Sequence, residues 1–337
     1  MMNEYMEYKV GIVGGSGYIG FELARYLSNF IKVKIIDIKP PINLPANIEY
    51  VYGDVRDYNS IKKALKDVDV VVHSAIIQIP RINKEKKLGY EVNVIGTQNV
   101  CKVTEENERI KGMVLTGTWH VFGEREITGI INEEFGYRPD KVEERAKLYA
   151  LSKVIQESIV RFYDEMSEKV FGVIRLGTVL GERMPEKTAA NIFINNGLKG
   201  KPLTPYKHSM YRPMLYIDIN DVCRAFKIFI DKILNEEFKE TSYHIINLVY
   251  PEPVTIIELA EIIKEVITEI TNGKISPPIQ IVDKGLPMMF SPEDKKKFQV
   301  DLSKLEKVLG IKSLISVKDS IRRIISSRLR NTVFNIQ

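Results

Sequence analysis

A tyrosine placed four residues before a lysine on one helix can act as an acid/base pair in hydride transfer. The lysine ammonium lowers the pKa of the phenol, so that the phenolate can take a proton from a substrate hydroxyl as hydride leaves. The chain contains this spacing four times, at Tyr5/Lys9, Tyr58/Lys62, Tyr137/Lys141 and Tyr149/Lys153. Only the last pair lies on a long predicted helix (143–165), which follows the turn Thr116-Gly-Thr118. We therefore single out Tyr149 and Lys153 as the reactive pair.

A glycine-rich stretch near the start of the chain is suited to bind a diphosphate. Gly14, Gly17 and Gly20 have the spacing G-x-x-G-x-x-G, between an apolar predicted strand (9–13) and a predicted amphipathic helix (21–30). The glycines allow a tight turn, close approach of an anion, and close packing of the helix on the strand, while the helix N-terminus offers free N–H groups. Because both flanking elements are readable, we predict a dinucleotide-binding loop.

The acid that ends the next predicted strand indicates which dinucleotide binds. The strand 31–37 ends at Asp37, which lies 17 residues beyond Gly20. A carboxylate at this point can accept hydrogen bonds from the adenosine ribose and would repel a 2′-phosphate, which favours NAD over NADP. The alternative is a solvated acid at the end of a strand.

The segments that must position these residues alternate between strand and helix. This alternation predicts an α/β fold with a Rossmann-type doubly wound parallel sheet over residues 7–176. The pattern loosens beyond residue 177, so we expect a smaller α/β substrate-binding region formed by 177–213 and 251–330. A further predicted strand at 243–248 could rejoin the first sheet, which would return about 214–250 to the first domain.

Taken in order, these motifs resemble those of the extended short-chain dehydrogenases/reductases, in the NAD-dependent epimerase/dehydratase family. The resemblance runs from about residue 9 to residue 325. The motifs that carry it are Gly-Gly-Ser-Gly-Tyr-Ile-Gly (14–20), Asp37, Gly53-Asp54, His73-Ser-Ala75, Asn93-Val-x-Gly-Thr97, Thr118-x-x-Val-Phe-Gly123, Tyr149-Ala-Leu-Ser-Lys153, Arg175-Leu-Gly-Thr-Val-Leu-Gly181 and Asp301-Leu-Ser-Lys304.

The resemblance implies roles for particular residues. Thr118, Tyr149 and Lys153 would form the catalytic set, and Lys153 would also bind the nicotinamide ribose. Asp54 and Val55 would lie by the adenine. The cofactor-binding residues implied in this way are Gly14, Gly17, Tyr18, Ile19, Gly20, Asp37, Asp54, Val55, Ala75, Asn93, Tyr149 and Lys153. By analogy, the helices around 90–106 and 146–166 would form a homodimer.

The second half of the chain resembles the nucleotide-sugar branch of the family. In that branch a Leu-x-Gly-x-Pro segment, here 198–202, lies along the nucleotide base. An arginine matching Arg212 reaches the diphosphate of the substrate, and a guanidinium fork suits a phosphate. The alternative is a surface arginine. The resemblance implies that Thr118, Thr178 and Arg212 bind the substrate, with Thr178 standing where the family commonly has an asparagine.

Two residues after the catalytic threonine depart from the family pattern. The 4,6-dehydratases carry Asp-Glu at the positions of Trp119 and His120, so we do not expect that dehydration here. His120 could face the sugar as an additional catalytic acid or base, or it could be a histidine satisfied within the structure. We expect His73, at the end of its strand, to be structural.

The resemblance implies an NAD-dependent nucleotide-sugar epimerase, most simply of the UDP-hexose 4-epimerase type. Tyr149 would remove the C4 hydroxyl proton, hydride would pass to NAD, and the 4-keto sugar would rotate and be reduced on its other face. The alternatives are a dehydrogenase or reductase acting on a non-nucleotide alcohol or ketone, another nucleotide-sugar modification, and a cofactor-binding sensor without turnover.

The bulk composition favours some partners and disfavours others. The net charge of +5 arises from 49 basic and 44 acidic residues, and no basic tract carries interleaved aromatics, so nucleic acid is not expected. No apolar run approaches the roughly 20 residues of a membrane span. Cys101 and Cys223 are expected to be buried thiols, and no metal-ligand spacing occurs. With a polar N-terminus unlike a signal peptide, the chain is expected to be cytoplasmic.

Overall fold

The computed structural model describes residues 7–238 and 244–334, and its centre is a parallel sheet of seven strands. The strands lie in the order β11-β7-β5-β4-β1-β2-β3, and all neighbours are parallel. Their bounds are β1 (Lys9–Val13), β2 (Lys32–Asp37), β3 (Ile48–Tyr52), β4 (Val70–His73), β5 (Gly112–Thr118), β7 (Val170–Leu176) and β11 (Ile245–Leu248). The predicted Rossmann-type fold class is therefore confirmed.

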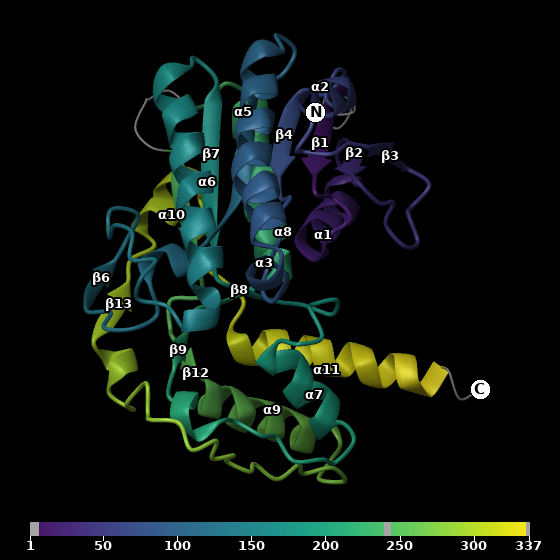
Figure 1. Ribbon diagram of the computed structural model, residues 1–337. Coiled ribbons are helices and arrows are strands. Elements are labelled where there is room, and N and C mark those ends of the chain that lie inside the picture. Colours follow the sequence, from purple (N-terminus) through teal and green to yellow (C-terminus); the bar gives the residue numbers. More distant parts are fainter. Residues whose placement is uncertain (1–6, 239–243, 335–337) are drawn as a thin grey trace.

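Helices cover both faces of this sheet (Figure 1). α1, α8 and α10 pack on one face through an apolar cluster, and α2, α5 and α6 pack on the other face through a second cluster. Because both faces are covered, the central strands are apolar, and every residue of β4 and β5 is buried. The helix bounds are α1 (Tyr18–Leu27), α2 (Tyr58–Ala64), α5 (Gly96–Glu106), α6 (Lys147–Met166), α8 (Ile219–Leu234) and α10 (Ser303–Leu309).

A smaller region lies beyond the carboxyl ends of the strands (Figure 1). It contains three helices and two pairs of short strands, β8 with β10 and β9 with β12, around an apolar core of its own. Its elements are β8 (Thr178–Leu180), α7 (Ala189–Gly197), β9 (Pro213–Met214), β10 (Tyr216–Asp218), β12 (Val254–Thr255), α9 (Ile256–Ile270) and α11 (Val317–Phe334). This region closes the end of the sheet at which parallel strands place their functional residues.

The remaining elements are short and lie in the connections between those already described. They are α3 (Arg81–Lys84), α4 (Lys86–Tyr90), a π-helical turn η2 (Glu91–Ile95), β6 (Gly129–Ile131), β13 (Phe298–Val300) and the 3₁₀ turns η3 (Trp119–Phe122), η4 (Glu144–Ala146), η5 (Lys207–Ser209) and η6 (Asp294–Lys296). β6 and β13 pair in parallel, which joins a loop of the first region to the C-terminal part of the chain.

Three elements begin at positions other than those predicted. α1 begins at Tyr18 because Gly17, in an extended conformation, acts as its N-cap. The helix predicted from 143 begins at Lys147, after the 3₁₀ turn η4. The strand predicted at 243–248 is β11, which rejoins the first sheet beside β7 as considered from the sequence. Tyr243 lies outside the described residues.

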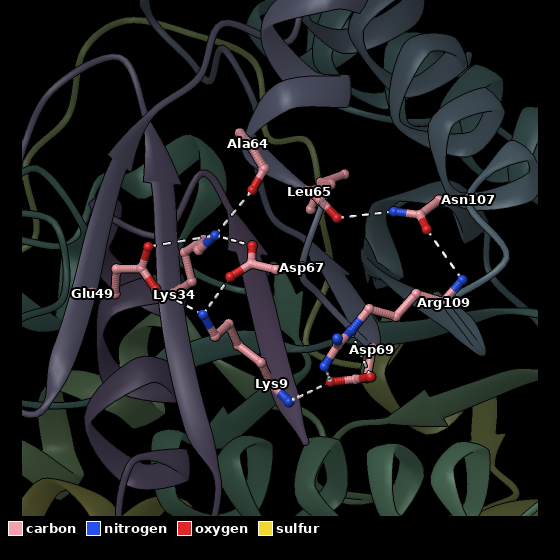
Figure 2. A network of polar contacts seen from close by, with 9 residues as sticks. All are labelled: Lys9, Lys34, Glu49, Ala64, Leu65, Asp67, Asp69, Asn107 and Arg109. Atoms are coloured by element: carbon pink, nitrogen blue, oxygen red, sulfur yellow. Dashed lines mark hydrogen bonds and ion pairs between the residues drawn. The ribbon is translucent and has the colours of Figure 1, made fainter. Parts of the chain in front are cut away.

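A network of charged side chains links neighbouring strands near their amino ends, away from the smaller region (Figure 2). The ammonium of Lys34 is almost fully buried and contacts Asp67 and Glu49, and Lys9 Nζ contacts the same two carboxylates at 2.5 and 3.0 Å. Two carboxylates around a buried ammonium offset the cost of removing it from water. The network therefore links side chains of β1, β2 and β3 with Asp67, which follows α2.

Candidate active site

A cavity of about 650 Å³ lies at the carboxyl ends of the strands. Its wall combines the glycine loop, the ends of β2 and β5, the segment 74–79, the start of α6 and part of the smaller region. The predicted residues that line it are Gly14, Gly17, Tyr18, Ile19, Gly20, Asp37, Asp54, Val55, Ala75, Thr118, His120, Tyr149, Lys153 and Thr178. Residues far apart in the sequence thus meet around one space, whereas Asn93 and Arg212 are not among its lining residues.

The glycine loop has the shape that a diphosphate cradle requires. Gly14 has φ +78°, and a Cβ built on it would lie 2.4 Å from the backbone nitrogen of Ala75. A Cβ on Gly20 would lie 2.6 Å from the carbonyl oxygen of Gly14, so the start of α1 packs directly on the turn. The first N–H groups of α1 have no intrahelical acceptor and carry the positive end of the helix dipole. These residues fit a dinucleotide diphosphate.

The carboxylate of Asp37 is oriented by the loop that it faces. Its Oδ2 accepts a hydrogen bond from the backbone nitrogen of Ser16 at 3.1 Å, and its Oδ1 accepts one from the backbone nitrogen of Lys39 at 3.3 Å. Asp37 therefore stands at the end of β2 beside the glycine loop, with a geometry suited to ribose hydroxyls.

Asp54 is paired with an arginine that sequence reasoning missed. The guanidinium of Arg56 contacts both oxygens of Asp54, through Nε at 3.0 Å and Nη2 at 2.6 Å, and both residues line the cavity. The hydrogen bonds from Arg56 hold the pKa of Asp54 below its ordinary value. Asp54 is therefore an ionised acceptor, suited to the amino group of a purine.

Asn93 lies behind the cavity wall. It is fully buried in the turn η2, and its Oδ1 accepts a hydrogen bond from the backbone nitrogen of Ile77 at 2.7 Å. Its Nδ2 donates to Oγ of Ser152 on α6 at 2.9 Å. Asn93 thus links the wall segment 74–79 to α6. The resemblance implied that Asn93 contacts the cofactor, whereas its side chain is not part of the cavity lining.

The reactive pair lies in the first turns of α6, next to the end of β5. The hydroxyl of Tyr149 is hydrogen-bonded to Thr118, and Lys153 Nζ donates to the carbonyl oxygen of Thr116 at 2.8 Å. Burial lowers the pKa of Lys153 to about 7, although the charge of Glu157 partly opposes this. Lys153 is therefore only partly protonated near neutral pH.

The sequence led us to expect that Lys153 lowers the pKa of Tyr149. This expectation is wrong. Burial raises the pKa of Tyr149 to about 12, and the hydrogen bond between the hydroxyls of Tyr149 and Thr118 only partly counters this. The physical reason is that desolvation penalises the phenolate and also penalises the ammonium that was expected to stabilise it.

The other Tyr/Lys pairs are placed elsewhere. Lys62 Nζ donates to the hydroxyl of Tyr58 at 3.2 Å on α2, and Tyr137 donates to Oε1 of Glu157 at 3.0 Å. Neither pair lines the cavity. Tyr5 lies outside the described residues.

His120 stands between the catalytic cluster and a buried acid. Its Nδ1 lies 3.1 Å from Oγ1 of Thr118, and its Nε2 lies 3.2 Å from Oε1 of Glu124. Its ring meets the ring of Tyr149 edge-on, with centroids 5.7 Å apart. The neighbouring Trp119 is buried and donates from Nε1 to Oγ1 of Thr178 at 3.3 Å. Glu124 was missed from the sequence, where its four-residue spacing from His120 was the only signal.

Arg212 is nearly buried and already has acidic neighbours. Its Nη1 forms an ion pair with Glu143 and lies 3.9 Å from Oε2 of Glu124. Its Nε is buried and has no hydrogen-bond partner. The Nε–H of the guanidinium is therefore available to a further acceptor, although the charge of Arg212 is offset by two carboxylates.

The remaining sequence expectations concern histidine and cysteine. His73 is fully buried, with Nε2 3.0 Å from Oγ1 of Thr97, and burial together with the charge of Lys153 lowers its pKa to about 3. It is therefore neutral and outside the cavity lining, as a structural histidine would be. Cys101 and Cys223 are free and buried, which confirms the expectation of two thiols. Within 7–238 and 244–334, no group of His, Cys, Asp and Glu side chains could hold a metal ion.

None of the described helices is both long enough and apolar enough to span a membrane.

A Rossmann sheet, a diphosphate cradle and a Thr-Tyr-Lys cluster around one cavity define the class of the extended short-chain dehydrogenases/reductases. Residues 10–247 match the model of the NAD dependent epimerase/dehydratase family, and the chain belongs to this enzyme family. The predicted cofactor, NAD, is the one that the family description names, so this prediction is confirmed.

Relatives and solved structures agree with this assignment. An uncharacterized Methanocaldococcus jannaschii protein is 28% identical, over 97% of this chain and 98% of its own. The UDP-glucose 4-epimerase of Rickettsia bellii is 29% identical, over 60% of this chain and 57% of its own. The NAD complex of Thermus thermophilus UDP-glucose 4-epimerase has a TM-score of 0.75 at 21% identity, over 94% of this chain and 98% of that one.

A second solved structure has a similar fold. The Bacillus cereus UDP-glucuronic acid 4-epimerase, in complex with UDP-glucuronic acid and NAD, has a TM-score of 0.75 at 21% identity. This comparison covers 95% of the present chain and 99% of the other. At this identity the similarity establishes the fold.

Proposed function

We propose that the protein is an NAD-dependent nucleotide-sugar epimerase, and that a UDP-hexose 4-epimerase reaction is the form best supported by its site. The observation that carries the proposal is the cluster of Thr118, Tyr149 and Lys153 on the wall of the dinucleotide cavity. Relatives whose names or ligands include UDP-sugars support the substrate class.

The cofactor would be held by the residues already placed around the cavity. The N-terminus of α1 would bind the diphosphate, Asp37 the adenosine ribose, and Asp54 and Val55 the adenine. When bound, NAD supplies a nicotinamide that can accept hydride from the sugar and return it. Lys153 would bind the nicotinamide ribose and Asn93 would hold the wall segment 74–79 in place.

Tyr149 would act as the base for the C4 hydroxyl, and Thr118 would hold that hydroxyl. The same phenol would return the proton after the keto sugar has rotated, so that the reaction has no net redox change. This use fits a tyrosine that lines the cavity and shares a hydrogen bond with Thr118. Thr178, fixed by the indole of Trp119, would contact the sugar where other members use an asparagine.

Arg212 would bind the diphosphate of the substrate. The buried Nε without a partner supports this role, because an approaching phosphate oxygen would satisfy it. The guanidinium would have to weaken its contact with Glu143 to do so.

The second candidate is an NAD(P)-dependent dehydrogenase or reductase acting on a non-nucleotide alcohol or ketone. The pairing of Arg212 with two carboxylates favours it, since that arginine then needs no substrate phosphate. Another reaction on a nucleotide-sugar is compatible with the same site residues.

A ligand panel separates these candidates. The melting temperature of the NAD-loaded protein is measured with UDP, UDP-glucose, UDP-glucuronic acid and simple ketones. A ligand present at 100 times its dissociation constant adds roughly 2.7 kcal/mol to the stability. We expect UDP and the UDP-sugars to raise the melting temperature. A shift with ketones and none with UDP would support the second candidate and contradict the first.

We also propose that the protein forms a homodimer through α5 and α6, which pack together on one face of the sheet (Figure 1). Leu151, Ile155, Phe162 and Met166 on α6 are exposed by 45%, 39%, 68% and 71%. An exposed row of large apolar side chains on one helix is typical of an interface. Light scattering of the wild type and of Phe162→Glu tests this: the wild type should have twice the monomer mass and the variant the monomer mass.

A further inference from the structure

Glu124 is a buried acid whose surroundings fix its charge. Its side chain is 2% exposed, Oε2 accepts a hydrogen bond from the backbone nitrogen of Glu143 at 3.1 Å, and the backbone nitrogen of Glu124 donates to the carbonyl oxygen of Lys141 at 2.7 Å. Burial acts to raise the pKa of Glu124, but contacts with His120, Arg212 and that backbone N–H lower it to about 2. Glu124 is therefore an anion that can only accept hydrogen bonds.

The charge on Glu124 determines which ring nitrogen of His120 carries the proton when the imidazole is neutral. Because Oε1 of Glu124 can only accept, the proton of the neutral imidazole lies on Nε2, 3.2 Å away. Nδ1 is then an acceptor, and it faces the hydroxyl of Thr118 at 3.1 Å. Thr118 can donate its proton to His120 and still accept one from Tyr149.

These contacts lie along a line from the cavity to the protein interior. It runs from the hydroxyl of Tyr149 through Oγ1 of Thr118 and the ring of His120 to Glu124. The charged and titratable groups that face His120 are Tyr149 on α6 and Glu124 on the loop after η3. Arg212 and Glu143 lie behind Glu124.

We propose that Tyr149, Thr118, His120 and Glu124 form a proton relay in which His120 takes up the proton that leaves Tyr149. The O–H bond of Tyr149 breaks as its proton passes to Oγ1 of Thr118, and the proton of Thr118 passes to Nδ1 of His120. The products are a phenolate and an imidazolium, with no change in electrons or in total protons. The imidazolium lies against the carboxylate of Glu124, which balances its charge.

The relay rests on the proposed hydride-transfer function, because it supplies the phenolate that takes the substrate proton. It accounts for how a tyrosine whose pKa lies far above neutrality can serve as a base. His120 would be a catalytic residue, and Glu124 a positioning residue that acts through it. A histidine that is merely satisfied between two partners would occupy the same place without affecting proton transfer.

The first experiment reads the histidine directly by ¹⁵N NMR on the NAD-loaded protein. The chain has only four histidines, so the spectrum of His120→Asn assigns the His120 signal. We expect a neutral ring protonated on Nε2 in the wild type, and loss of that preference in Glu124→Gln. A ring protonated on Nδ1 in the wild type would overturn the relay, because Thr118 could then not donate to it. This readout does not depend on which substrate the enzyme turns over.

The second experiment measures kcat and KM against pH for the wild type, His120→Asn and Glu124→Gln, with Glu126→Gln as the matched control. Glu126 undergoes the same chemical change two residues away, but it is exposed and pairs with Lys141. General acid/base groups typically contribute about 100-fold or more, so we expect kcat of both relay variants to fall at least about tenfold at pH 7. KM should change by less than about twofold, and the lost activity should return as pH rises toward the ionisation of Tyr149.

The outcomes separate the relay from the proposed function. A uniform loss of activity at all pH values in His120→Asn, or an unchanged profile in Glu124→Gln, would contradict the relay while leaving the function intact. If the wild type converts no nucleotide-sugar, the proposed function fails. The NMR measurement then still decides whether His120 is held as a proton acceptor.

Discussion

Lys153 donates a hydrogen bond from Nζ to the carbonyl oxygen of Thr116, so α6 is fastened to the end of β5 where the reactive residues gather. The ammonium of Lys153 is buried there, in a position from which water is largely excluded. This burial also lowers the pKa of Lys153 to about 7, so the lysine is only partly charged near neutral pH. Lys153 therefore both joins α6 to β5 and sets how much positive charge lies beside the reactive residues.

The stability of the protein should depend on pH through Lys153. Its pKa is about 7 in the folded state and 10.5 in its ordinary environment, so the unfolded chain binds the additional proton between these values. Stability should therefore rise as pH increases from about 7 toward 10.5, and the penalty is fully present below pH 7. We expect Lys153→Met to raise the melting temperature at pH 7 by at least about 2–4 °C, and by less at pH 10. Calorimetry at both values checks this, and an equal shift at both would contradict it.

Substitutions of two glycines in the loop should have different effects, one on folding and the other on cofactor binding. A Cβ on Gly14 would meet the backbone of Ala75 at a positive φ, so Gly14→Ala should lower the melting temperature without any ligand. A Cβ on Gly17 would meet only the carbonyl oxygen of Gly14, at 3.3 Å, so Gly17→Ala should fold nearly normally. It should nevertheless lose at least about tenfold in NAD affinity, because the Cβ would occupy the approach to the helix N-terminus. Calorimetric titration with NAD measures this, and wild-type affinity in Gly17→Ala would refute the placement of the diphosphate.

Arg212 should contribute to substrate binding and not to cofactor binding. We expect Arg212→Lys to raise KM for a UDP-sugar about tenfold, since an ammonium cannot replace a guanidinium fork on a phosphate. The affinity for NAD should stay within about twofold of the wild type. Kinetics and NAD titration of the same preparation provide both values. Unchanged KM would mean that Arg212 serves only to neutralise Glu143 and Glu124.

The charge network around Lys34, near the amino ends of the strands, should stabilise the protein at neutral pH and less so at strongly acidic pH. Contacts with Lys34 and Lys9 outweigh burial and lower the pKa of Asp67 from 3.8 to about 2. Its stabilising contribution is therefore present above about pH 4 and is lost as pH falls toward 2. We expect Asp67→Asn to lower the urea midpoint clearly at pH 7 and less at pH 3, because Lys34 would lose a partner while buried.

The matched control for this network is Glu236→Gln. Glu236 is 80% exposed and pairs with Lys111 at 3.2 Å, so removing its charge should change the urea midpoint very little at either pH. An effect of Asp67→Asn no larger than that of the control would show that the network adds nothing to stability.

The fold could be predicted from the sequence because its signals are local. The apolar run that forms β4 is buried on both faces, and the glycine spacing identifies the turn that leads into α1. The Tyr149/Lys153 pair could be chosen among four because its helix and the preceding turn were readable. These features depend on neighbours within a few residues.

The polar surroundings of the site could not be predicted in the same way. Arg212 pairs with Glu143 across 69 positions of sequence, and only the folded chain brings them together. The pKa of Tyr149 was expected to fall and instead rises, because burial cannot be judged from the spacing of two residues. Glu124 belongs to no recognisable motif, and its contact with His120 depends on the turn η3, which contains His120 and ends shortly before Glu124.

The most direct test of the proposed function is ¹H NMR of UDP-glucose and, separately, of UDP-galactose incubated with the NAD-loaded protein. The account predicts that both samples reach the same mixture of the two sugars, with no net change in absorbance at 340 nm. Tyr149→Phe should abolish the conversion. Steady formation of NADH, or no interconversion of these or related UDP-sugars, would contradict the assignment as a nucleotide-sugar 4-epimerase.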